Sequence, residues 1–246
     1  GVNVNYEVAG ADAARAAVAD LAARGADAIK LLLEGYQDDP ARLTLAETQA
    51  AVAAAHAHRL PARAHVRTEQ AFRQALEAGV DVVEHVPAPD GELERDPDGK
   101  IKLPPKFTDL LDQAAEDEVI LVPTLQALTD ETDRPEVLLA AVRHFHQAGG
   151  QIALGNDYGT PGIPVGLPLG EMELLLQAGL TPMQVIQAGT RLAAAACGQE
   201  RELGTIEAGK LADVIVVDGN PLSDLHELAN LRFVVLGGEI VEPTPR

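Results

Sequence analysis

Residues 61–86 constrain the fold of this chain more than any other stretch, because they contain a strand, a helix and a second strand. The first strand ends at His65, and Thr68 then offers an N-cap for a helix that Gly79 would end. The second strand is rich in valine and carries His85 at its end. Strands joined by a crossover helix are parallel, so their carboxyl ends lie side by side. The pattern therefore predicts two imidazoles at one edge of a parallel sheet, where α/β enzymes carry their chemistry.

The same alternation of strand and helix recurs along the chain. Apolar runs of strand length are separated by segments of helical character, and no hairpin signal lies between them. This order is typical of an α/β fold with a parallel sheet and helices outside it. The five predicted strands are 26–33, 61–65, 80–86, 119–125 and 151–157. The predicted helices are 11–24, 44–58, 68–79, 108–118, 135–148, 169–178 and 182–196.

Two parts of the chain break this pattern. Residues 87–106 form a charged insertion, in which the turn signal Asp-Pro-Asp-Gly predicts a small hairpin. Residues 204–218 and 232–241 are β-rich with glycine turns, which predicts a few antiparallel strands appended to the α/β part. The predicted domains are therefore residues 1–200 and a C-terminal β-segment, residues 201–246.

Composition and charge narrow the class of protein. A hydrophobic content of 46% is ample for a core, and the net charge of −19 argues against nucleic acid or an anionic membrane as partner. The chain has one cysteine, Cys197, which excludes an internal disulfide framework and favours a cytoplasmic protein. No run reaches the roughly 18 apolar residues of a membrane span. The expected partner is a small-molecule substrate.

Four polar residues occupy or end strands of the predicted sheet. An unpaired ammonium in the middle of an apolar strand, as at Lys30, is costly, so the lysine is expected to be paired, neutral or chemically altered, or to reach solvent near the strand end. His65 and His85 are either hydrogen-bonded core histidines or a metal or acid–base pair. Asp157 ends another apolar strand and is otherwise a turn or N-cap aspartate. The four together are far more specific than any one of them.

Two other histidine pairs imitate a metal site. His56 and His58 have the His-x-His spacing of many hydrolytic centres, and His144 and His146 repeat it. Both pairs lie in predicted helices, where residues two apart point in different directions. We therefore expect neither pair to bind a metal.

Several segments together resemble the amidohydrolase superfamily, most closely the imidazolonepropionase-like and prolidase-like metal-dependent hydrolases. The strongest is the glycine- and valine-rich segment 203–218, which includes Glu-Ala-Gly-Lys-Leu-Ala-Asp. The resemblance covers nearly the whole chain. The other matching segments are 25–30, 65–85, 123–125, 155–157 and 235–238.

The resemblance implies a fold and a set of roles. The fold would be part of a (β/α) TIM-type barrel, its five parallel strands corresponding to the second half. Lys30, carboxylated to a carbamate, would bridge two metals, with His65 and His85 on the second metal. Asp157 would bind the first metal and act as general base. The divalent metal, most simply zinc, would activate a water for hydrolysis of an amide, lactam, ester or related acyl bond.

The chain also departs from the family. The family's His-x-His belongs to a first strand that would precede this sequence, and Asn156 replaces the more usual threonine or serine before the aspartate. Three hypotheses follow: an active hydrolase with one metal held by Lys30, His65 and His85; a catalytically weakened fragment or pseudoenzyme; or an assembly subunit whose missing barrel half comes from a partner or a longer parent chain. We favour the first, and expect a homo-oligomer joined along residues 1–33, because an open parallel sheet has unpaired edges.

Overall fold

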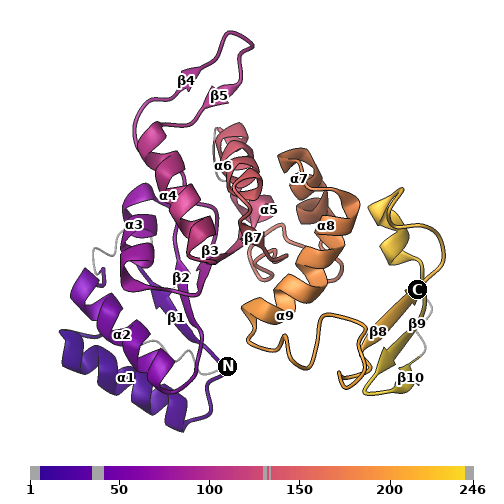
Figure 1. The fold of residues 1–246 in the computed structure, drawn as a ribbon, viewed down its shortest axis with the longest axis horizontal. Helices are drawn as coiled ribbons and strands as arrows, with labels where there is room; N and C mark the ends of the chain where they lie inside the picture. The colour runs from indigo at the N-terminus through magenta and orange to yellow at the C-terminus, as the bar shows by residue number, and fades with distance from the viewer. Residues whose placement is uncertain (1–5, 35–41, 130–131, 133, 242–246) are drawn as a thin grey trace.

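A five-stranded parallel sheet forms the centre of the fold in the computed structural model, which describes residues 6–34, 42–129, 132 and 134–241 (Figure 1). Its strands follow one another in the order β1-β2-β3-β6-β7, and all neighbours are parallel. The predicted α/β fold with five parallel strands is thus confirmed. The strands are β1 (Ile29–Leu32), β2 (Ala62–His65), β3 (Val82–Glu84), β6 (Ile120–Val122) and β7 (Gln151–Ile152).

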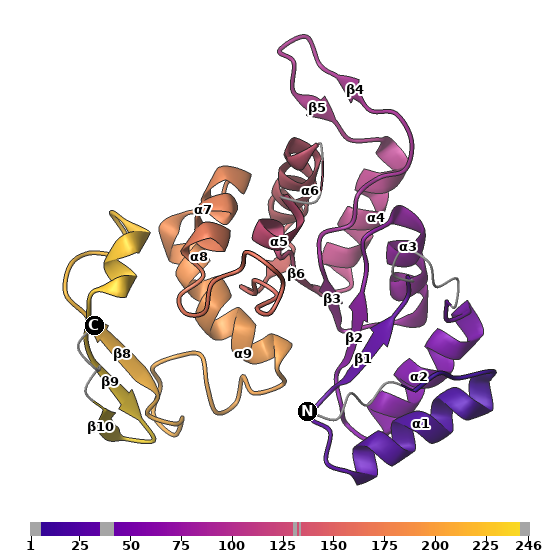
Figure 2. The same cartoon turned by 180° about the vertical axis from the view of Figure 1, so that it is seen from behind.

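Helices follow an arc along the outer face of the sheet (Figures 1 and 2). Their predicted end signals act as expected. Thr44 and Glu47 form a capping box, Thr68 caps the next helix, and Gly79 ends it with φ 76°. The main core lies between these helices and the strands, filled by alanine, valine and leucine. The helices are α1 (Ala11–Ala23), α2 (Leu45–Ala57), α3 (Glu69–Ala78), α4 (Pro105–Glu116), α5 (Leu125–Thr129), α6 (Pro135–Gln147) and α7 (Leu169–Ala178).

The inner face of the sheet is divided into an apolar and a polar part. On β3, on β6 and at Ala153 directly after β7, its side chains form a second apolar cluster, which α9 (Ala193–Ala196) covers through Ala196. On β1 and β2 three of the inward side chains are polar: Lys30 pairs in register with Arg63, and the next inward residue of β2 is His65, opposite Leu32. The sequence favoured a strand buried on both faces at 26–33. Instead, burial alternates along β1, leaving Lys30 and Leu32 exposed on the inner face.

The segment after α7 differs from the single helix predicted at 182–196. It consists of α8 (Pro182–Gln187), a π-helical turn η1 (Ala188–Leu192) and α9. The Ala188 carbonyl accepts a hydrogen bond from the Leu154 amide at 2.9 Å, which explains the local widening of the helix. The strand predicted to run to residue 157 ends at Ile152; Ala153 still donates to the Leu121 carbonyl of β6 at 2.9 Å, and Leu154 donates to Ala188 instead.

Two small antiparallel elements complete the fold. The predicted hairpin in 87–106 is present as β4 (Glu94–Arg95) and β5 (Ile101–Lys102), which project beyond α4 (Figure 1). The C-terminal part holds a sheet of β8 (Val214–Val217), β9 (Leu231–Leu236) and β10 (Glu239–Val241), with the 3-10 helix η2 (Leu225–Ala229) between β8 and β9. The boundary between residues 200 and 201 stays a prediction.

Every helix in the described ranges is too short or too polar to span a membrane.

Candidate functional site

His65 and His85 meet at the carboxyl ends of neighbouring strands. His65 is the last residue of β2 and His85 directly follows β3, so the parallel pairing brings them to one edge of the sheet. Their ring centroids lie 4.4 Å apart with an interplanar angle of 72°, and each residue is 6% exposed. The crossover helix between the two strands therefore places two buried imidazoles in contact, as the sequence pattern predicted.

The backbone is strained where these strands end. Of the five non-glycine residues with positive φ in the described ranges, three follow strands of the sheet: His85 at 70°, Thr124 at 49° and Asp157 at 54°. For a β-branched residue such as Thr124 this conformation is a genuine outlier. Such strain persists only where the surroundings hold it, and it clusters at functional sites. Here Thr124 Oγ1 lies 2.7 Å from His85 Nδ1.

Burial and neighbouring positive charge keep both histidines neutral. Burial, followed by the charges of His65 and Lys30, lowers the pKa of His85 to about 3. Burial and the Lys30 charge also lower the pKa of His65. Asp157 opposes the shift at both rings. Neutral imidazoles retain a ring nitrogen lone pair, which is the form that binds a metal.

Lys30 is part of an ion-pair network on the inner face of the sheet. Its Nζ contacts Glu84 Oε2, while Glu84 Oε1 accepts from Arg63 Nε at 2.6 Å. Burial, and then the charge of Arg63, lowers the pKa of Lys30 to about 8, and Asp157 acts in the opposite direction. With 39% of its side chain exposed, Lys30 is paired rather than extended freely into solvent. Side chains from β1 and β2 thus pair with one carboxylate of β3, directly before His85.

Asp157 acts electrostatically on Lys30 and the two histidines, but it does not complete a set of metal ligands with them. Its charge acts on Lys30, His65 and His85, and its Oδ2 accepts from Thr160 Oγ1 at 3.1 Å. Within the described ranges, no three His, Cys, Asp or Glu side chains are close enough together to hold a metal. The structure therefore brings the two histidines into contact and places Lys30 and Asp157 around them.

Several residues near this pair, or linked to it through α5, had no predicted role. Alternation along β2 places Arg63 on the same face as His65, which is a signal that was available. Thr124 and Glu84 lay within segments that carried the family resemblance, yet neither received a function. Glu171 is buried on α7, and its hydrogen-bond partners are distant in sequence.

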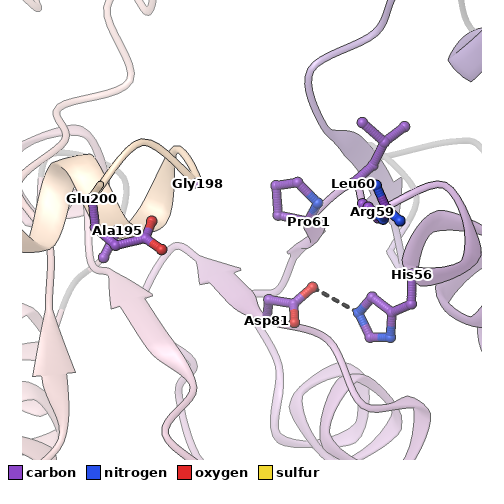
Figure 3. Close-up of a pocket in the computed structure, with 8 residues that line it drawn as sticks. All are labelled: His56, Arg59, Leu60, Pro61, Asp81, Ala195, Gly198 and Glu200. Carbon is purple, nitrogen blue, oxygen red and sulfur yellow. Dashed lines mark hydrogen bonds and ion pairs between the residues drawn. The ribbon is translucent and has the colours of Figure 1, made fainter. Parts of the chain in front are cut away.

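A pocket of the described structure lies elsewhere. It has a volume of about 480 Å³ and opens between the segment before β2 and the end of α9 (Figure 3). His56, from one of the two helical His-x-His pairs, lines this pocket, and its Nε2 lies 2.9 Å from Asp81 Oδ2. His144, from the other pair, contacts Asp112 at 2.8 Å. Because Pro61 and Asp81 precede β2 and β3, this pocket is at the opposite strand ends from His65, away from the position typical of catalysis in such sheets.

Two comparisons with proteins of known structure place the fold. The chain matches the crystal structure of a Xaa-Pro dipeptidase with bound methionine in the active site, at 27% identity and a TM-score of 0.77, covering 96% of this chain and 59% of that one. It also matches the crystal structure of an A. niger ochratoxinase with a TM-score of 0.77, covering 96% of this chain and 55% of that one. At 24% identity, the second match shows the fold alone.

Sequence comparison identifies the relatives. An imidazolonepropionase from Symbiobacterium thermophilum is 38% identical over 79 residues, which are 32% of this chain and 19% of that protein. The matched region is thus a small share of the relative, and the chain spans about three fifths of the dipeptidase. The Amidohydrolase family matches residues 3–241, nearly the full sequence. This chain therefore belongs to the amidohydrolase family.

Proposed function

We propose that this chain takes part in the hydrolysis of an amide, lactam, ester or related acyl bond, with a divalent metal, most simply zinc, at His65 and His85. The observation that carries the proposal is the contact between these two buried imidazoles at the carboxyl ends of β2 and β3, in a chain of the amidohydrolase family. The names of its relatives, an imidazolonepropionase and a Xaa-Pro dipeptidase, favour an amide-type bond.

The residues present fit a divalent metal. Two neutral nitrogen donors are adjacent, and Thr124 holds one ring through Nδ1, which leaves Nε2 for coordination. Lys30 would supply the third ligand as a carbamate, which requires its contact with Glu84 to be given up. Arg63 would then remain as the partner of Glu84, so the carboxylate would not be left unpaired. A divalent ion bound there would polarise the substrate carbonyl and lower the pKa of a bound water towards ~7.

The residues of the chain would then handle the proton. The oxygen of a water attacks the carbonyl carbon, and the Asp157 carboxylate accepts the proton that the water releases. When the bond from carbon to the leaving nitrogen breaks, Asp157 returns that proton to the nitrogen. The charge of Asp157 acts on Lys30, His65 and His85, which supports its place beside the reacting atoms.

Zinc content tests the site. We predict about one zinc ion per chain, as expected for a catalytic site of three protein ligands. His65→Ala and His85→Ala should each abolish binding, measured by elemental analysis after dialysis. His56→Ala is the matched control, since His56 contacts Asp81 at the other strand ends, and it should keep its zinc. Full metal content in both site variants would refute the assignment.

Turnover tests the reaction. The zinc-loaded chain should hydrolyse members of a panel of Xaa-Pro dipeptides, cyclic amides and esters, and Asp157→Asn should lose activity while keeping zinc. Loss of zinc in Asp157→Asn would instead make the aspartate chiefly a ligand. A zinc-binding chain that hydrolyses nothing in the panel would leave the site assigned and the proposed reaction class unsupported.

A further inference from the structure

Glu171 is the one buried acidic residue in the part of the chain that the structure describes. It lies on α7, with 0% of its surface exposed. Its carboxylate accepts two backbone hydrogen bonds, from Leu125 N at 2.9 Å and Gln126 N at 2.6 Å. A buried carboxylate is costly, so a specific arrangement has to compensate for it. Here both oxygens are satisfied by amides 45 and 46 residues earlier in the chain.

These two amides begin α5, where backbone N–H groups have no partner within the helix. Thr124 directly precedes α5, and its carbonyl accepts from Leu128 N at 3.3 Å. A threonine at such an N-cap position ordinarily caps the helix with its own hydroxyl. In this chain that hydroxyl contacts His85 Nδ1 at 2.7 Å instead. The cap that Thr124 does not provide is supplied by Glu171.

We propose that Glu171 is a positioning residue for His85, which it holds through α5 and Thr124. By capping α5 from α7, the carboxylate removes the competition between the helix amides and the imidazole for the Thr124 hydroxyl. The hydroxyl then fixes the orientation of the His85 ring. The inference rests on the proposed function only in assuming that His85 is a metal ligand.

The packing around this link supports a fixed arrangement. Thr124 has φ 49°, a conformation that a threonine keeps only under external restraint. The backbone bonds of Leu125 and Gln126 to Glu171 provide such a restraint directly after it. A Cβ added at Gly170 would lie 2.8 Å from the Gln126 side chain, so α7 is seated closely against α5. The strain at Thr124 and the buried carboxylate thus belong to one structural unit.

Histidine spectroscopy on the metal-free chain tests the link without activity. Imidazole ¹⁵N shifts of the seven histidines report tautomer and hydrogen bonding, and the resonance missing in His85→Gln assigns His85. Glu171→Gln, which leaves one helix amide without its acceptor, should shift the His85 Nδ1 resonance. Glu173→Gln is the matched control. It is the same substitution on the same helix, but the Glu173 side chain is half-exposed and pairs with His226. It should leave His85 unchanged.

Zinc affinity provides the second readout. Removing an outer partner of a metal ligand typically weakens binding by about 10- to 100-fold, and we expect that loss in Glu171→Gln but not in Glu173→Gln. In a Thr124→Ala background, Glu171→Gln should add no further shift at His85, since the hydroxyl that links them is gone. Glu171→Asp, which keeps the charge but shortens the reach, serves if the glutamine variant does not fold.

The outcomes separate this inference from the proposed function. A wild-type chain that binds no zinc would contradict the metal site, while a His85 shift in Glu171→Gln would still support the positioning role. If every folded Glu171 variant has the same His85 resonances as the Glu173→Gln control, the positioning role is overturned, whatever the zinc result. If Thr124→Ala leaves His85 unchanged, the hydroxyl link is absent and the inference fails irrespective of Glu171.

Discussion

At the scale of single residues, the buried carboxyl of Glu171 makes stability depend on pH. Burial raises its pKa to about 7 from 4.5, against the two amide hydrogen bonds that favour the charged form. Because the folded chain binds this proton more tightly than the unfolded chain, stability from Glu171 is present at pH below 4.5 and is lost as pH rises to about 7. The loss is on the order of 3 kcal/mol at most.

Glu171→Gln should remove this dependence. We expect the variant's destabilisation relative to wild type to shrink between pH 5 and pH 8, because only the wild type loses stability as the carboxyl ionises. Urea unfolding of both chains at the two pH values measures the difference. A destabilisation that is the same at both pH values would show that the buried carboxyl does not titrate in this window.

Lys30 is tested by a second substitution at this scale. Lys30→Ala should lose zinc because it removes the third ligand, and added acetate should partly restore binding by supplying a carboxylate in its place. In the wild type, native mass spectrometry should show the zinc-loaded chain heavier by one CO₂. Lys102→Ala, at an exposed lysine paired with Glu94, is the control. Zinc content as high in Lys30→Ala as in Lys102→Ala would exclude a carbamate ligand.

At the scale of elements, one arginine joins the sheet to the last helix of the α/β part. Arg63 on β2 donates through Nε to Glu84 Oε1 at 2.6 Å and through Nη1 to the Ala196 carbonyl at the end of α9 at 2.8 Å. α9 in turn covers the apolar inner cluster on β3, on β6 and at Ala153. The arginine therefore fixes the helix that keeps this part of the inner face dry.

Arg63→Met should destabilise the fold by about 1–3 kcal/mol, since it leaves a partly buried carboxylate and a helix-end carbonyl each short of a partner. Arg73→Met is the control, because Arg73 forms an exposed pair with Glu69 within α3, worth no more than about 0.5 kcal/mol. Chemical denaturation of the two variants measures both values. Equal stability of the two variants would mean that Arg63 does not anchor α9.

Local signals in the sequence predicted most of these elements, and long-range bonds account for what they missed. The capping box at Thr44 and the helix end at Gly79 depend on residues that are neighbours in sequence, so these helix ends could be predicted. The meeting of His65 with His85 followed from the parallel pairing of adjacent strands. The π-helical turn could not be predicted, because it depends on Leu154 reaching the Ala188 carbonyl. The Glu171 cap was missed for the same reason, since nothing near it in sequence shows that α5 needs a partner.

At the scale of the whole molecule, the two edges of the parallel sheet differ. The β7 side continues into the hydrogen bond between Leu154 and Ala188. β1 ends the sheet on the other side, with Leu32 41% exposed on its inner face. Unpaired edge groups and exposed apolar surface favour association, at ~25 cal/mol for each Å² buried. We propose that the chain forms a homo-oligomer through β1 and the residues around it.

Sedimentation velocity at micromolar concentration tests this assembly. The wild type should sediment as a dimer or larger species, and Leu32→Glu should shift it towards monomer by placing a charge on the edge. Met183→Glu on α8 changes a side chain of similar exposure, 47%, away from that edge and should not alter the assembly. A well-folded wild-type monomer would rule the proposal out.

The order of strands in the sheet bears on how the chain is made. Each strand of the parallel sheet pairs with the one that leaves the ribosome just before it, apart from the small β4–β5 hairpin between β3 and β6. Each pairing therefore joins strands that are neighbours in the chain, and a strand can add to the one already made as synthesis proceeds. The bond from Arg63 to Ala196 spans 133 residues and can form only after the whole parallel sheet has been made. Until α9 emerges, the valine and isoleucine side chains of the inner apolar cluster lack their contact with Ala196, so during this interval they are open to non-native association.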